Sequence, residues 1–168
     1  MLNDGKKMYS YLFEGYWKDV GTIESLWEAN MDLLGKNPEF NLYDKRWRIF
    51  YRHNAQPPHK FGENGKVYNA MLTEGCVVNG EVRNSVLSNG VRVEEGAYVN
   101  DCVIMGNVTI KKGAKIEYAI IDHDTVIGEN AAVGGKRADG CKITVLGAGC
   151  KVADGAVIES GAMLDAQD

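Results

Sequence analysis

Several features are scarce or absent in this sequence of 168 residues, and each absence excludes a class of protein. No apolar run approaches the roughly 18 residues of a membrane-spanning helix, and the polar N-terminus is not a signal peptide. Positive charge is not in excess, since 19 Lys and Arg stand against 23 Asp and Glu and give a formal net charge of −4. Neither nucleic acid nor a membrane is therefore an expected partner, because phosphate binding requires clustered positive charge.

Cysteine and histidine are also few, with four and three residues respectively. The cysteines lack the spacing of metal ligands and fall inside repeat-like segments, so we interpret them as small buried residues of a protein in a reducing compartment. A cytoplasmic location is the corresponding expectation. Proline is rare at 3 residues, whereas glycine is abundant at 20, which indicates many turns.

From about residue 67 the sequence repeats. Apolar residues recur in steps of six, six and five, and this pattern of three steps then starts again. The frame is Ala70, Cys76, Val82, Leu87, Val93, Val99, Ile104, Ile110, Ile116, Ile121, Ile127 and Val133. A second row lies four residues after each frame position and is small or β-branched almost throughout. Its members are Gly80, Val86, Val91, Ala97, Val103, Val108, Ala114, Ile120, Thr125 and Ala131.

This spacing predicts a prism with three flat sides, in which short parallel strands form coils that stack about 4.7 Å apart. Frame residues would point inward, and glycines such as Gly90 and Gly96 would supply the positive φ of the turns. The pattern breaks at residues 134–137 and resumes at Leu146. A β-sandwich would instead show period-two alternation, so we predict a mainly β protein with a parallel β-helix of hexapeptide repeats over residues 67–168.

Residues 1–35 have a different pattern. Alternating aromatic residues predict a strand over residues 8–20, and Thr22 is placed to cap a helix that would end before Gly35. One strand and one amphipathic helix cannot bury their apolar faces alone. We therefore interpret residues 1–35 as the remnant of a larger domain, and we expect the sequence to begin inside a longer protein.

Residues 36–66 have no single periodicity and are interpreted as an interdomain linker. They contain a basic and aromatic cluster with Lys45, Arg46, Arg48 and Arg52. The cluster has two interpretations, an anion-binding site or a linker strand whose arginines pair with acids of the missing domain. The second interpretation is favoured.

The repeats resemble the left-handed parallel β-helix of hexapeptide proteins, a fold that serves several unrelated activities and does not decide function. The upstream residues are more specific. Residues 13–22 (FEGYWKDVGT) and the helix that follows closely resemble the end of the catalytic domain in bacterial glucose-1-phosphate adenylyltransferases. Residues 42–47 and 57–61 continue the resemblance, which thus covers essentially the whole chain.

The resemblance implies an α/β nucleotidyltransferase domain upstream, which would carry the nucleotide loop. The full protein would then make ADP-glucose and pyrophosphate from ATP and glucose 1-phosphate for glycogen synthesis. Two site residues carry over: Asp19 would be a catalytic carboxylate that binds Mg²⁺, and Trp17 would line the glucose 1-phosphate pocket. Without the resemblance, Asp19 is a solvated or helix-capping acid and Trp17 a core aromatic.

The resemblance also implies regulation and assembly. Enzymes of this family respond to small anionic effectors, so Arg46, Arg48 and Arg52 become possible effector-binding residues. The family forms tetramers, and we expect a homo-oligomer or a hetero-oligomer with a paralogous subunit. The fragment itself would serve assembly and regulation and would be inactive alone.

Two alternatives stay open. A non-catalytic regulatory paralogue would have the same fold, but such paralogues tend to lose the metal-binding acid that Asp19 retains here. A free-standing hexapeptide acyltransferase needs a histidine base between subunits, and His123 is the only histidine of the repeats. A zinc carbonic anhydrase of this fold would need three histidine ligands, so that function is close to excluded.

Overall fold

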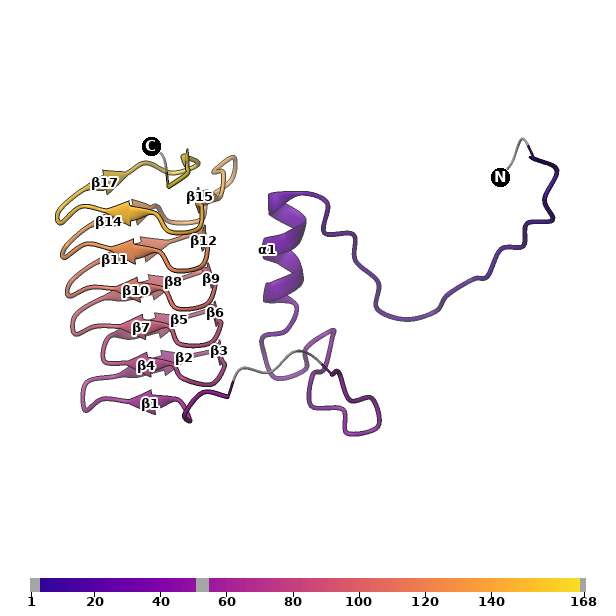
Figure 1. Cartoon of the computed structure of the whole chain (residues 1–168), viewed down its shortest axis with the longest axis horizontal. Coiled ribbons are helices and arrows are strands. Elements are labelled where there is room, and N and C mark those ends of the chain that lie inside the picture. The colour runs from indigo at the N-terminus through magenta and orange to yellow at the C-terminus, as the bar shows by residue number, and fades with distance from the viewer. Residues whose placement is uncertain (1–3, 51–54, 167–168) are drawn as a thin grey trace.

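The computed structural model describes residues 4–50 and 55–166, and these form a three-sided β-helix with one α-helix beside it (Figure 1). Every strand pairing is parallel, and the strands build three sheets of six strands each. No helix within the described ranges is long and apolar enough to cross a membrane. The fold prediction of a mainly β chain with a parallel β-helix is therefore confirmed.

Each strand is only two or three residues long. The first sheet contains β1 (Lys60–Phe61), β4 (Val77–Val78), β7 (Arg92–Val93), β10 (Thr109–Ile110), β13 (Val126–Ile127) and β16 (Lys151–Val152). The second sheet contains β2 (Lys66–Tyr68), β5 (Glu81–Arg83), β8 (Tyr98–Asn100), β11 (Lys115–Glu117), β14 (Ala132–Gly134) and β17 (Val157–Ile158). The third sheet contains β3 (Met71–Leu72), β6 (Val86–Leu87), β9 (Val103–Ile104), β12 (Ala119–Ile121), β15 (Thr144–Leu146) and β18 (Met163–Leu164).

The strand register explains the period of the repeat. Val82 pairs with Val99 and Leu87 pairs with Ile104, so each frame residue lies directly above the equivalent residue of the previous coil. From Val82 to Val133 every frame residue is buried. These stacked aliphatic columns form the core, because burial of apolar area is the main favourable term in folding.

The predicted frame is wrong before Val82. Val67 pairs with Val82 and Leu72 with Leu87, because the connection from β4 to β5 is two residues shorter than the equivalent connection in the later coils. Ala70 and Cys76 therefore do not belong to the frame columns and instead pack beside them as small residues against the core. The first strand of the β-helix is β1, upstream of the residue at which the repeat pattern becomes visible in the sequence.

The second row also needs a correction on the third sheet. Val86, Val103 and Ile120 each immediately precede a frame residue, and neighbouring residues of a strand point to opposite faces. They therefore point away from the core rather than into it. On this sheet the inward small residues are those two positions before the frame, namely Ser85, Cys102 and Ala119, all fully buried.

The break in the pattern is an insertion between two strands. Ile104 pairs with Ile121 at the regular spacing, whereas Ile121 pairs with Leu146, much further along the chain. The extra residues form the loop 135–143, which leaves the coil after Gly134. Gly134 has φ +73°, and a Cβ there would collide with the carbonyl oxygen of Glu117, so the exit from the strand requires glycine.

Helix α1 (Ile23–Met31) begins as the sequence predicts. The Thr22 side chain accepts a hydrogen bond from the Ser25 N–H, and the Ser25 hydroxyl accepts one from the Thr22 N–H, which completes a capping box. The helix ends at Met31, earlier than predicted, with Asp32 as its C-cap. Gly35 has a positive φ of +93°, but it lies in the turn that follows the helix.

Helix α1 packs against the outward face of the third sheet, beside β9, β12 and β15 (Figure 1). Trp27 is only 3% exposed and packs with Val103, Ile120 and Ile143 in a second hydrophobic cluster. Its indole Nε1 donates a hydrogen bond of 2.8 Å to the carbonyl oxygen of Asp101. The outward apolar residues of the third sheet are thus the docking surface for α1.

The loop 135–143 closes over the same contact. The Arg137 guanidinium lies 4.7 Å from the Trp27 ring centroid. Tyr118 meets the same indole edge-on, with ring centroids 5.2 Å apart. Cation–π and edge-to-face contacts each add to the stabilisation that Trp27 obtains from burial.

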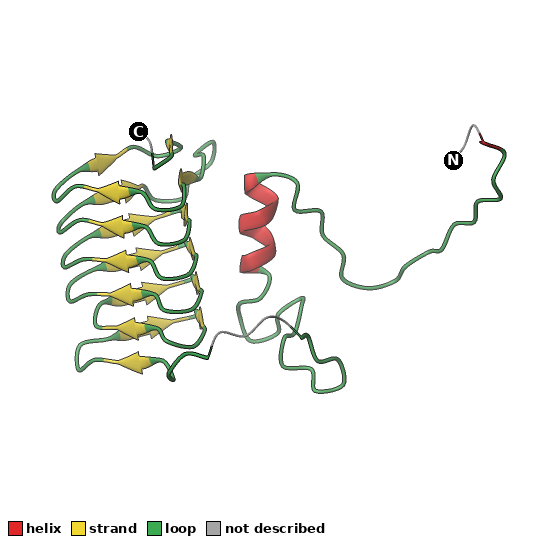
Figure 2. Ribbon diagram, in the orientation of Figure 1, coloured by secondary structure: helices red, strands yellow, loops and turns green. Residues whose placement is uncertain are grey.

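The strand predicted over residues 8–20 is wrong. The segment is extended but pairs with no other strand among the described residues, and Figure 2 draws it as a loop. Tyr9, Tyr11 and Leu12 are more than 80% exposed. Alternating aromatic residues favour an extended backbone, but a strand also needs a neighbour that accepts and donates its backbone hydrogen bonds.

The four cysteines differ sharply in accessibility, and this predicts their reactivity. Cys141 is exposed, whereas Cys76, Cys102 and Cys150 are buried. Burial raises the pKa of the Cys102 thiol to about 12 and also raises the pKa of Cys76. Because the thiolate is the reactive form, we expect one thiol to react with Ellman's reagent at pH 8 in the native protein, and all four after denaturation.

The matched variant for this measurement is Cys141→Ser. It should abolish the fast reaction in native protein and leave three thiols in denaturant. Fast modification of two or more thiols in the native protein would contradict the buried positions of the other three.

Candidate functional site

The predicted site residues lie on the extended segment just before α1. In this segment Tyr16 and Lys18 face the helix, because both bond to Asp32 at its C-terminal end. The Tyr16 hydroxyl donates to Asp32 Oδ2 at 3.0 Å, and Lys18 Nζ donates to the same oxygen at 2.7 Å. Successive side chains of an extended backbone alternate in direction. The exposures agree with this alternation, since Tyr16 and Lys18 are partly buried whereas Trp17 and Asp19 are exposed and directed away from the helix.

The contacts with Asp32 shift the titration of both donors. The hydrogen bond to Asp32 raises the pKa of Lys18, and the Glu28 carboxylate, 3.4 Å from Lys18 Nζ, adds to this effect. Burial raises the pKa of Tyr16, and its hydrogen bond to Asp32 raises it further. Lys18 is thus stabilised in its charged form and Tyr16 in its neutral form, and both remain donors to the carboxylate.

Asp19 is exposed, and the structure excludes the helix-capping alternative for it. Asp19 Oδ1 accepts the N–H of Gly21 at 3.0 Å, outside α1. Thr22 and Ser25 cap the helix without it. Asp19 Oδ2 has no hydrogen-bond or ion-pair partner within residues 4–50 and 55–166. Oδ2 of Asp19 is thus available to bind a ligand from solvent.

The arrangement fits part of a magnesium site. Mg²⁺ is often held by only one or two carboxylates together with water and substrate phosphates, and the exposed carboxylate of Asp19 has the chemistry of one such ligand. No group of three or more histidine, cysteine or acidic side chains occurs in the described part of the chain that could hold a metal unaided. The resemblance implies a second acid from the upstream domain.

Trp17 is 75% exposed, so it is not a core residue of the described structure. An exposed indole is an apolar surface on which a sugar ring can stack. Since Trp17 and Asp19 share one side of the segment, an aromatic surface and a carboxylate are presented together.

The arginine cluster has a local partner that the sequence analysis missed. Arg46 makes a bidentate contact with Asp44, through Nε to Oδ1 at 3.1 Å and Nη2 to Oδ2 at 3.0 Å. This guanidinium lowers the pKa of Asp44. Arg48 is exposed, and Arg52 lies outside the described residues. An Asp two positions before an Arg in a turn is the sequence signal for this pair.

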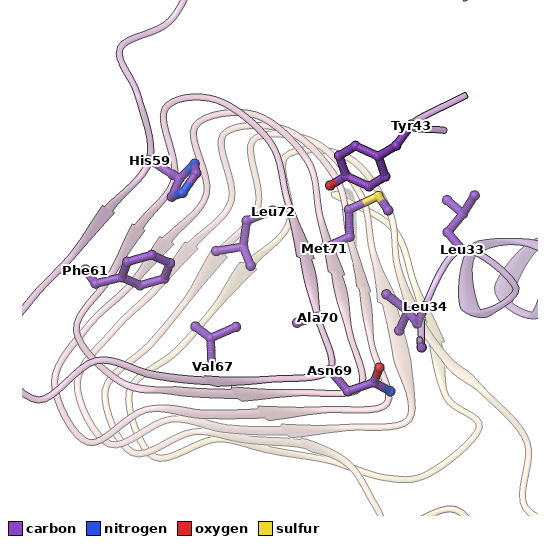
Figure 3. A pocket seen from close by; sticks show the side chains of 11 residues that line it. Leu33, Leu34, Tyr43, His59, Phe61, Val67, Asn69, Ala70, Met71 and Leu72 are labelled. Atoms are coloured by element: carbon purple, nitrogen blue, oxygen red, sulfur yellow. The ribbon is translucent and has the colours of Figure 1, made fainter. Parts of the chain in front are cut away.

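A hollow of about 480 Å³ lies at the open start of the β-helix (Figure 3). Phe61, Val67 and Leu72 point into it from the three sides of the first coil, while Leu34 and Tyr43 border it from the linker side. The polar side chains of the lining are Tyr43, His59 and Asn69. The three inward residues are the first members of the core columns, so the hollow is the uncovered end of the core and holds no constellation for catalysis.

Two protein families match different parts of the chain. The family described as "GlmU-like, C-terminal hexapeptide" matches residues 57–144, which contain most of the β-helix. This chain belongs to that hexapeptide-repeat family. The family described as "Nucleotidyl transferase" matches residues 1–36, which contain Trp17, Asp19 and α1.

Several curated relatives of this hexapeptide-repeat protein are glucose-1-phosphate adenylyltransferases. Glucose-1-phosphate adenylyltransferases of Bacillus mycoides and Bacillus anthracis are each 47% identical over 133 residues, which is 79% of this chain and 35% of theirs. The glucose-1-phosphate adenylyltransferase of Acetivibrio thermocellus is 39% identical over 174 aligned residues, covering 98% of this chain and 41% of the relative. The predicted resemblance is confirmed, and the chain spans well under half the length of these relatives.

The surroundings of His123 do not support the acyltransferase alternative for this hexapeptide-repeat protein. His123 Nδ1 contacts Asp122 Oδ1, and the imidazole is exposed on a turn of the β-helix. Within the described residues no nucleophile or second histidine adjoins it.

Proposed function

We propose that this chain is the C-terminal part of a glucose-1-phosphate adenylyltransferase. The full enzyme would transfer the adenylyl group of ATP to the phosphate of glucose 1-phosphate, releasing pyrophosphate and forming ADP-glucose for glycogen synthesis. The similarity to enzymes of that name over 79–98% of the chain supports the proposal. So does the match of residues 1–36 to the nucleotidyl transferase family.

The observation that carries the proposal is the shared orientation of Trp17 and Asp19. In a nucleotidyl transfer, a phosphate oxygen attacks the α-phosphorus of ATP, and pyrophosphate leaves from the opposite side. Bound Mg²⁺ would neutralise the charge that builds up between two phosphate-bearing substrates. Asp19 would be its ligand from this chain, and Trp17 would bind the glucose ring of the acceptor.

The remaining chemistry belongs to residues that this chain does not contain. Neither a glycine-rich phosphate loop nor an adenine pocket occurs in its sequence, so this chain alone would be inactive. Its own roles would be to contribute Asp19 and Trp17, to support assembly, and to carry an anionic effector near Arg46, Arg48 and Arg52. A cytoplasmic location would suit a bacterial glycogen enzyme.

The test is pyrophosphate release from ATP, Mg²⁺ and glucose 1-phosphate, measured on this chain and on the protein extended upstream through its own gene. The proposal predicts release by the extended protein only. The assignment would be overturned if the extended protein released no pyrophosphate from these substrates, or if it transferred an acyl group from acyl-CoA.

Assembly is a further part of the proposal, as a homotetramer or a tetramer with a paralogous subunit. The last coil is an open end of the β-helix, where the core residues Val152, Ile158 and Leu164 are only partly buried. Solenoids cover such ends with caps or partner chains. Light scattering should therefore give at least twice the 18.5 kDa of one chain. A clean monomer at micromolar concentration would contradict this prediction.

A further inference from the structure

We propose that Asp32 is a positioning residue for the site. Its carboxylate would hold Tyr16 and Lys18 against α1 and thereby present Trp17 and Asp19 together on the open side. We call the two hydrogen bonds from Tyr16 and Lys18 to Asp32 the clamp, and they are contacts within this chain. The expected effect of the clamp on kinetics rests on the proposed function.

The place of Asp32 on the helix is the first argument. Asp32 is the C-cap of α1, where the partial negative charge of the helix dipole disfavours a carboxylate. The last turn of α1 has no basic residue to offset this charge. The compensating cation is Lys18, from the segment before the helix, with Nζ 2.7 Å from Asp32 Oδ2. An acid in this unfavourable position is explained if its role is to bind that segment.

The second argument is that the segment is held at two neighbouring inward positions rather than one. Asp32 Oδ2 accepts from both Tyr16 and Lys18, and the three side chains are partly buried. The Tyr16 ring also stacks on Phe40, with centroids 5.3 Å apart and an interplanar angle of 26°. Fixing residues 16 and 18 of an extended segment fixes the direction of residues 17 and 19, because the backbone alternates.

The third argument is that Asp32 belongs to a helix that is itself fixed on the β-helix. Helix α1 is anchored on the β-helix by Trp27, whose indole bonds to the carbonyl of Asp101. Asp32 follows directly at the end of this helix. The position of Asp19 is thus set relative to the β-helix through Asp32, although the Asp19 carboxylate itself bonds to the N–H of Gly21 and not to the helix.

Two measurements test the proposal. The first is trypsin cleavage after Lys18 in the chain as it stands, with cleavage after the exposed residues Lys6 and Lys7 as internal reference. Asp32→Ala should raise the rate at Lys18 about tenfold, because the freed segment opens more often. The rate at Lys6 and Lys7 should not change.

The second measurement is kinetics of the enzyme extended upstream. Asp32→Ala and Lys18→Met should each lower kcat/KM about 100-fold, since a small misplacement of catalytic groups has effects of this size. The loss should divide between a lower kcat, from displaced Asp19, and a higher KM for glucose 1-phosphate, from displaced Trp17. Lys18→Arg keeps the cation and should restore most activity. Glu24→Gln, an exposed substitution in the first turn of the same helix, is the matched control.

The outcomes separate the clamp from the proposed function. The double variant Asp32→Ala/Lys18→Met should be no worse than either single variant, because the two residues act as one unit. Unchanged cleavage at Lys18 in Asp32→Ala would overturn the clamp, whatever the kinetics. Faster cleavage with unchanged kinetics would overturn the positioning role alone. A silent wild-type enzyme would overturn the proposed function and the positioning role together, while cleavage would still decide the clamp.

Discussion

Asp19→Asn in the enzyme extended upstream is expected to lower kcat roughly 1,000-fold. A metal ligand contributes several kcal/mol of charge stabilisation in the transition state. A factor of ten in rate corresponds to about 1.4 kcal/mol of barrier height. Asparagine keeps the side-chain oxygen that accepts the Gly21 N–H, so the local turn should persist. The measurement is the steady-state rate of pyrophosphate release as a function of Mg²⁺ concentration.

The matched control is Glu14→Gln, which removes an exposed carboxylate from the same extended segment. It should leave kcat and the Mg²⁺ dependence as in the wild type. Equal activity of Asp19→Asn and wild type would remove Asp19 from the site, and equal losses in both variants would indicate an effect of net charge rather than of a metal ligand.

Trp27→Ala is expected to undock α1 from the β-helix. Truncation of a buried tryptophan typically costs about 3–5 kcal/mol, and Trp27 also donates the hydrogen bond to the Asp101 carbonyl. A helix of nine residues is marginal in water without tertiary packing. Hydrogen exchange should therefore accelerate throughout α1 and leave the core strands of the β-helix protected.

Two further variants should accelerate hydrogen exchange in α1 less than Trp27→Ala does. Trp27→Phe keeps an aromatic ring but loses the indole donor, so it should give an intermediate acceleration. Arg137→Ala removes only the cation above the ring, a contribution of about 0.5–1 kcal/mol at an exposed site. Slow exchange in α1 of Trp27→Ala would show that Trp27 does not anchor the helix.

The core columns could be predicted from the sequence because each coil repeats the same chemistry at the same spacing. In the regular coils the frame from Val82 to Val133 falls on the inward columns. The frame failed before Val82 because the connection from β4 to β5 is two residues shorter than its later equivalents, and the alternating apolar and turn residues fit either spacing there. The repeat spacing of a sequence predicts which residues point inward only over a stretch in which several coils share that spacing.

The docking of α1 could not be predicted in the same way. The sequence placed Val103 and Ile120 in the second row of small or β-branched residues, yet they cover the outside of the third sheet. An apolar residue indicates burial but does not say on which side of the sheet. The contact also depends on Arg137, from a loop that interrupts the repeat and has no pattern of its own.

The sequence motif pointed to the candidate site residues Asp19 and Trp17, and the structure added Asp32. The segment FEGYWKDVGT directed attention to Asp19 and Trp17, but the alternating aromatic residues before them predicted a strand that does not form. Asp32 gave no signal, because an acid after a helix is ordinary in sequence and its bonds to Tyr16 and Lys18 become visible only in three dimensions.

The most direct test of the central claim is phosphorus NMR of the products formed by the protein extended upstream. With ATP, Mg²⁺ and glucose 1-phosphate, the account predicts ADP-glucose and pyrophosphate in equal amounts, and no ADP-glucose from the Asp19→Asn variant over the same time. Unchanged substrates in the wild-type reaction, or ADP-glucose formed equally well by Asp19→Asn, would contradict the account.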